Sequence, residues 1–107
     1  MAPEMSVVEL SERLAAADPS FVLLDIREPD EWQIARLEGA TFLSMREIPT
    51  RLDELDPEHT YAVMCHHGVR SAMVTAFLQQ NGFPNAFNVT GGIDAYAQIV
   101  DSAVPLY

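Results

Sequence analysis

The chain has 107 residues, which is enough for one domain of ordinary size and too few for two independent catalytic domains. Its composition, 49% hydrophobic and 21% charged, is that of a globular protein rather than a disordered segment. Sixteen acidic and six basic side chains give a net charge of −10, which argues against a nucleic-acid or anionic-membrane surface, and the absence of lysine excludes Schiff-base chemistry.

The first half of the sequence predicts alternating helices and strands. Ser6 and Glu9 have the spacing of a capping box and precede apolar residues at helical intervals. Asp18 and Pro19 end this helix, and the continuous apolar run that follows is typical of a strand buried on both faces. The expected elements are, in order, a helix at 7–17, a strand at 21–26, a short helix at 29–36, a strand at 41–44 and a helix at 46–55.

The second half continues this alternation. Its expected elements are a strand at 61–64, a helix at 71–80, a strand at 86–89 and a helix at 93–100. Such an order implies right-handed crossovers and a mainly parallel sheet with helices on both faces. Since no internal repeat or linker interrupts it, we expect residues 1–107 to form a single domain.

Cys65 is the only cysteine, so the chain can form neither an intramolecular disulfide nor a CxxC pair. The first residues lack a signal-peptide pattern, and no apolar run reaches the roughly 18 residues of a membrane span. We therefore expect a protein that has no contact with the membrane and lies in a reducing compartment, the cytoplasm.

Residues 65–71 join the end of a predicted strand to the start of a predicted helix. In an open parallel sheet, chemistry collects beyond the carboxyl ends of the strands. Gly68 allows a turn with positive φ, and the successive N–H groups of such a turn can bind an anion. A helix N-terminus and the nearby Arg70 both favour the thiolate of Cys65, the nucleophilic form.

Plainer interpretations of the same residues stay open. Cys65 could be a small buried hydrophobe, Arg70 a surface cation, and His66 and His67 polar loop residues. Because adjacent side chains usually point different ways, we expect no metal site built from Cys65 and the two histidines. The other histidine, His59, precedes the strand and should lie at the opposite end of the sheet, which argues against a protease-like Cys–His pair.

The segment 65–71 resembles the active-site loop of the rhodanese (sulfurtransferase) family. Three further segments are similar to family motifs in the expected order: 24–28 with Trp32, 37–40, and 88–96. The resemblance covers about residues 5–100. It implies a three-layer rhodanese-like α/β fold, with a parallel sheet of four or five strands flanked by helices.

The resemblance also implies a chemistry. Family members attack the outer sulfur of a donor such as thiosulfate, and the resulting persulfide passes its sulfur to cyanide or another thiophilic acceptor. By position, Cys65 is the nucleophile and Arg70 is the cation of the loop. The persulfide would be held by the backbone N–H groups of residues 66–71, which include His66, His67, Gly68, Val69 and Ser71. Asp25 and Arg27 match family residues at the neighbouring strand end, where direct substrate contact and a structural ion pair are equally open. No cofactor is implied, and the partners would be a small sulfur donor and a small or protein acceptor.

The sequence departs from the family pattern in its histidines. His66 and His67 stand where many relatives carry arginine or other residues, so the loop has less fixed positive charge than in relatives that use thiosulfate well. We hypothesise that the two imidazoles supply variable charge near neutral pH. An unchanged pH dependence of sulfur transfer after replacing both by alanine would contradict this.

Other functions stay open beside sulfur transfer. Cell-cycle phosphatases of the same fold place five residues between cysteine and arginine, whereas four separate Cys65 from Arg70. Arsenate reduction would need a thiol from another molecule to resolve the intermediate. A non-catalytic regulatory module would need neither the cysteine nor the arginine. The local charge does allow an anionic donor, because residues 61–107 carry only −1 of the net charge.

Overall fold

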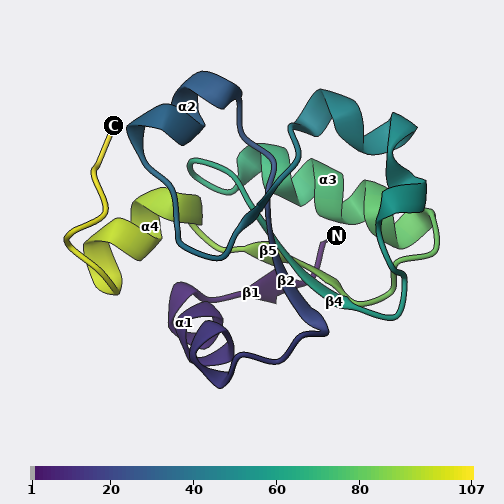
Figure 1. The fold of residues 1–107 in the computed structure, drawn as a ribbon, viewed down its shortest axis with the longest axis horizontal. Helices are drawn as coiled ribbons and strands as arrows, with labels where there is room; N and C mark the ends of the chain where they lie inside the picture. The colour runs from purple at the N-terminus through teal and green to yellow at the C-terminus, as the bar shows by residue number, and fades with distance from the viewer. Residues whose placement is uncertain (1) are drawn as a thin grey trace.

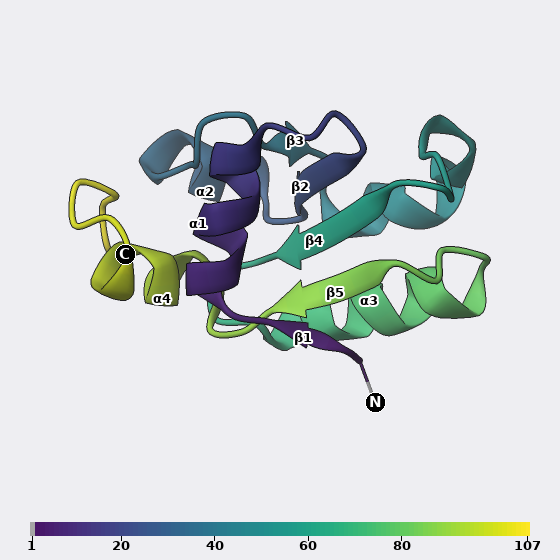
Figure 2. The same cartoon turned by 90° about the horizontal axis from the view of Figure 1, so that it is seen from below.

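The centre of the sheet is formed by two buried strands. The computed structural model, which describes residues 2–107, pairs β2 (Phe21–Asp25) with β4 (Thr60–Met64) in parallel over all five residues. β5 (Ala86–Val89) lies on the other side of β4, and the short strands β1 (Glu4–Met5) and β3 (Thr41–Phe42) form the edges. All four pairings are parallel, in the order β1-β5-β4-β2-β3. In Figure 1 the strands lie between α1 (Val7–Ala16) and α3 (Val69–Gln80), and Figure 2 shows the order of the strands.

Helices cover both faces of this sheet. Successive strand residues alternate between two apolar clusters, so that Leu23 contributes to one and Leu24 to the other. One cluster packs against α1 and α4 (Gly92–Ile99), and the other against α3 and the 3-10 helix η1 (Met45–Thr50). In Figure 2, α1 lies in front of the strands and α3 behind them. The predicted three-layer parallel architecture is therefore confirmed.

The remaining elements connect the strands. α2 (Pro29–Ile34) follows β2, and a second 3-10 helix, η2 (Leu52–Glu54), follows η1. None of the helices within residues 2–107 combines the length and the apolar character that a membrane crossing requires.

Several expectations about elements differ from the structure. α2 and β3 each end two residues earlier than expected. Residues 46–55 form two 3-10 helices rather than one α-helix, because Pro49 lies inside the segment and has no N–H to donate. No sequence pattern indicates β1, because a strand of two residues is too short for one. α3 begins at Val69, two residues earlier than expected, directly after Gly68 at its N-cap.

The carboxyl ends of the parallel strands lie at the same end of the sheet. The arrowheads of β4 and β5 point to the side where α4 and the C-terminal segment lie (Figure 2). Cys65 follows β4 at this end of the sheet, whereas His59 precedes β4 at the opposite end, as expected.

Candidate functional site

Cys65 lies at the end of β4 with its sulfur among hydrogen-bond donors. The residue is 1% exposed. Its Sγ accepts hydrogen bonds from the backbone N–H of Gly68 at 3.1 Å and of Ser71 at 3.4 Å, and the Ser71 hydroxyl oxygen lies 3.2 Å away. The burial fits an inert core cysteine, but the converging donors do not, because an apolar core would leave the sulfur without them.

Gly68 gives the loop its shape. It adopts φ +100° and caps the N-terminus of α3, a conformation that a residue with a Cβ rarely adopts. Within residues 2–107, no acceptor takes a hydrogen bond from the backbone N–H groups of His66, His67, Val69 or Arg70. Free N–H groups at a helix start, next to a left-handed residue, form an anion-binding arrangement.

The pKa of the Cys65 thiol reflects these contacts. Burial raises this pKa, but hydrogen bonds from Ser71 and Gly68 and the charge of Arg70 outweigh burial, so the pKa lies below the ordinary thiol value. A lowered pKa increases the thiolate fraction at neutral pH. The loop therefore combines a nucleophilic sulfur with donors for an anion.

Asn88 on β5 and Glu4 on β1 extend this network. The Nδ2 group of Asn88 donates to the Gly68 carbonyl at 3.1 Å and to the Glu4 carboxylate at 3.0 Å. Its Oδ1 accepts a hydrogen bond from the Ser71 hydroxyl. The edge strand β1, which the sequence did not predict, therefore fixes the amide that contacts Ser71.

Arg70 is engaged by a carboxylate from α2. Its two terminal nitrogens donate to the two oxygens of Glu31 at 2.7 and 2.9 Å. This fork lowers the pKa of Glu31 to about 2. Three of the five guanidinium donors remain without an acceptor within residues 2–107, so Arg70 can still bind an anion, but its charge is compensated.

Tyr107 joins the same group of side chains. Its hydroxyl accepts a hydrogen bond from Arg27 at 2.7 Å and donates one to Glu31 at 2.8 Å. Its ring stacks on His66, with the centroids 3.8 Å apart and the planes 6° from parallel. Burial raises the pKa of Tyr107 to about 12, so the hydroxyl keeps its proton at neutral pH.

Asp25 and Arg27 form a fully buried ion pair. The guanidinium bonds the carboxylate at 2.7 and 2.9 Å, and Asp25 also accepts the backbone N–H of Arg27. The other Arg27 donors bond Tyr107 and the carbonyls of Glu31 and Ala35. With all five donors of Arg27 used, this arrangement favours the structural interpretation over substrate contact.

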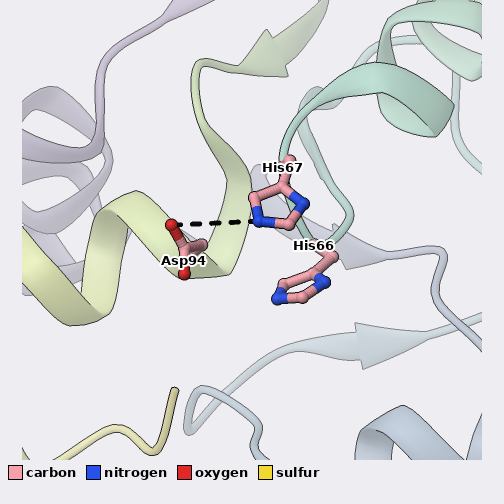
Figure 3. A group of neighbouring side chains, drawn as sticks. All are labelled: His66, His67 and Asp94. Atoms are coloured by element: carbon pink, nitrogen blue, oxygen red, sulfur yellow. Dashed lines mark ion pairs between the residues drawn. The ribbon is translucent and has the colours of Figure 1, made fainter. Parts of the chain in front are cut away.

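The two loop histidines do not point in different directions. Their ring centroids lie 3.9 Å apart with the planes 30° from parallel, so the expectation that these adjacent side chains point different ways is wrong. Both lie beside Asp94 at the start of α4 (Figure 3). Burial and the neighbouring His67 lower the pKa of His66, which weakens the hypothesis that His66 is partly charged at neutral pH.

The sequence analysis assigned no site role to five residues that contact the loop or support a residue that does. The capping-box spacing of Glu28 and Glu31 was a signal for the start of α2 but not for the pairing with Arg70, 39 residues away. Asn88 and Asp94 lie in the segment 88–96 that resembles a family motif, but that resemblance does not indicate their contacts. Glu4 and Tyr107 carried no signal, because their contacts depend on how distant segments meet. The missed residues are Glu4, Glu31, Asn88, Asp94 and Tyr107.

Sequence comparison finds relatives along almost the whole chain. A family model described as a Rhodanese-like domain matches residues 6–99. The chain is 38% identical over 112 residues to the Rhodanese-like/PpiC domain-containing protein 12, chloroplastic, of Arabidopsis thaliana, covering 97% of this chain and 37% of that longer protein. It is 35% identical over 98 residues to a sulfurtransferase of Allochromatium vinosum, with 92% and 91% of the two chains covered. It is 33% identical over 75 residues to the thiosulfate sulfurtransferase GlpE of Actinobacillus succinogenes, with 70% and 68% covered.

Structural comparison agrees with these matches. A crystal structure of a rhodanese-related protein from Thermoplasma volcanium superimposes with a TM-score of 0.84 at 28% identity, covering 98% of this chain and 99% of that chain. The residues that the family model matches include the strands β2 to β5 and the Cys65 loop. The chain therefore belongs to the rhodanese-like domain family.

Proposed function

We propose that this protein is a sulfurtransferase that forms a persulfide on Cys65. The observation that carries the proposal is the convergence of the Gly68 and Ser71 N–H groups on the sulfur. The same contacts lower the pKa of the thiol despite its burial. The sulfurtransferases of Allochromatium vinosum and Actinobacillus succinogenes, to which the chain is similar, support the proposal.

The proposed first step loads the sulfur. The Cys65 thiolate attacks the outer sulfur of thiosulfate or another sulfane-sulfur donor, and a new S–S bond forms. The S–S bond of thiosulfate breaks, and sulfite leaves with the electron pair. The negative charge now lies on the terminal sulfur of Cys65–S–S⁻, where the unused N–H groups of His66, His67, Val69 and Arg70 can stabilise it.

The proposed second step unloads the sulfur to an external acceptor. The chain has no second cysteine, so cyanide, a small thiol or a protein must attack the terminal sulfur. The S–S bond then breaks and restores the thiolate of Cys65. The reaction uses no cofactor, and a reducing, cytoplasmic compartment would keep the single thiol available.

The other loop residues have distinct proposed roles. Arg70 orients the anionic donor through the donors that Glu31 leaves unused. Ser71 lowers the pKa of the Cys65 thiol, and Gly68 allows the turn with positive φ. Asp25 and Arg27 hold the end of β2 from within and make no proposed contact with substrate. We also propose that residues 1–107 act as a single domain, because both apolar clusters pack on one sheet.

Intact mass spectrometry tests the proposal. After incubation with thiosulfate or polysulfide, the protein should gain the mass of one sulfur atom, and cyanide should then remove it. The Cys65→Ser variant should gain nothing. If the parent gains no sulfur from either donor, the proposal fails, and turnover of an aryl phosphate by the parent would favour the phosphatase alternative instead.

A further inference from the structure

His66, His67 and Asp94 form a cluster of metal-ligand side chains beside the Cys65 loop. Each offers one ligand atom, and these atoms all lie within 4.8 Å of one another. Figure 3 shows the two imidazoles from the loop and the carboxylate from α4 around the same space. The sulfur of Cys65 is not part of this group, because it bonds to Gly68 and Ser71 instead.

The backbone holds the two halves of the cluster together. The N–H of Ile93 donates to the Cys65 carbonyl at 2.9 Å, and the N–H of Asp94 donates to the His66 carbonyl at 3.1 Å. Gly92 allows this approach, since a Cβ there would lie 2.5 Å from the Cys65 carbonyl oxygen. The first turn of α4 is therefore fixed against the loop. The Asp94 carboxylate, which accepts a hydrogen bond from Gln98, lies near the histidines.

The His66 ring is also held in place. It lies between the rings of His67 and Tyr107, at centroid distances of 3.9 and 3.8 Å. Its Nε2 atom is buried and has no hydrogen-bond partner within residues 2–107. A buried polar nitrogen without a partner is costly, so a ligand from outside the chain that bonded this atom would remove that cost.

The ligand types select the class of ion. Two imidazoles and one carboxylate suit zinc and similar divalent transition metals, whereas magnesium and calcium prefer oxygen ligands alone. Tetrahedral ligands at zinc distances lie about 3.4 Å apart, so the ligand atoms, which lie within 4.8 Å of one another, must approach by up to about 1.4 Å. The His67 side chain is 62% exposed and lies 4.0 Å from the Asp94 carboxylate, so small side-chain rotations can close this gap.

We propose that His66, His67 and Asp94 bind one zinc-class divalent cation, with water in the remaining coordination position. The site is separate from the sulfur-bonding groups of Cys65, so binding does not require the thiol. The proposal is independent of sulfur transfer and can fail or succeed without it.

Titration of the Cys65→Ser variant with zinc, monitored by calorimetry, tests the site. This variant removes the thiol as a competing ligand. We expect one zinc ion per chain, and Asp94→Asn or His67→Ala should each weaken binding about tenfold or more. The matched control is His59→Ala, because His59 and Asp56 form an ordinary surface His–Asp pair at 3.5 Å.

Nitrogen-15 NMR of the histidine rings provides a readout that needs no change at the site. Zinc should shift the ring signals of His66 and His67 and leave those of His59 in place. Three results would overturn the proposal: no stoichiometric binding to Cys65→Ser, equal affinity after His67→Ala and Asp94→Asn, or zinc shifts centred on His59.

Discussion

The Ser71 hydroxyl has one proton and two acceptors within reach. The Oδ1 atom of Asn88 faces it because the Nδ2 group of Asn88 is held by the Gly68 carbonyl and by Glu4. The sulfur of Cys65 lies 3.2 Å from the same hydroxyl. A neutral thiol can donate to the serine oxygen, whereas a thiolate attracts the serine proton. Ser71 therefore responds to the ionisation of Cys65.

Replacing Ser71 by alanine should raise the pKa of Cys65. A hydrogen bond to the charged form lowers a pKa, so its loss favours the thiol and slows reactions of the thiolate below that pKa. The rate of iodoacetamide alkylation against pH should show its midpoint below the ordinary thiol value in the parent and at higher pH in Ser71→Ala. Thr75→Val is the control, because this buried hydroxyl lies one turn later and bonds the Ser71 carbonyl. An unchanged midpoint in Ser71→Ala would contradict the prediction.

Glu31 compensates the charge that Arg70 offers to a donor. Glu31→Gln should lower the KM for thiosulfate about threefold to tenfold, the effect of about 1 kcal/mol in the interaction with an anion. Steady-state kinetics with thiosulfate and cyanide would measure it. Glu54→Gln changes the net charge equally, but its partner is Arg51. A higher KM in Glu31→Gln would show that the carboxylate mainly positions Arg70.

The proximity of the loop residues could be predicted from sequence, but the partners of their side chains could not. Cys65, Gly68, Arg70 and Ser71 lie within seven residues, so their proximity follows from one turn. The partner of Arg70 lies 39 positions away. Such contacts depend on the packing of α2 and of the segment around Tyr107, which no local pattern encodes.

At the scale of elements, buried strands and capped helices were predictable because each carries a local signal. The apolar runs that form β2 and β4 and the Ser6 cap of α1 were sufficient. β1 forms only because β5 offers it an edge, through Thr90 and Asn88 donating to Met5 and Pro3. η1 has helical apolar spacing, but Pro49 prevents the α-helical hydrogen bonds.

Because α4 packs closely on the loop, replacing Gly92 by alanine should cost more stability than replacing Gly39. Gly92→Ala should destabilise the protein by about 2 to 5 kcal/mol, because the methyl group would overlap the carbonyls of Cys65 and His66 in addition to the cost of a positive φ. Gly39 also has positive φ but has open space around it, so Gly39→Ala should cost about 1 kcal/mol. Urea unfolding measures both. Equal costs would mean that α4 can move away from the loop freely.

The charge of the whole molecule opposes the local preference of the loop. The net charge is −10 on a body of 35 × 29 × 25 Å. At 0.01 M salt the Debye length is about 30 Å, so all these charges act on an approaching anion, whereas at 0.15 M it is about 8 Å and only nearby groups do. The free N–H groups and Arg70 lie nearby and attract anions at either salt concentration.

Alkylation of Cys65 by a charged and by a neutral reagent separates the repulsion of anions by the net charge from their attraction by the loop. The rate with iodoacetate, an anion, should rise about threefold to fivefold between 10 and 150 mM NaCl, because salt screens the distant carboxylates more than the adjacent donors. The rate with neutral iodoacetamide should stay constant and controls for changes in the thiol itself. A fall in the iodoacetate rate with salt would mean that the positive potential of the loop outweighs the net charge even at long range, and the acidic first half would then have no influence on donor approach.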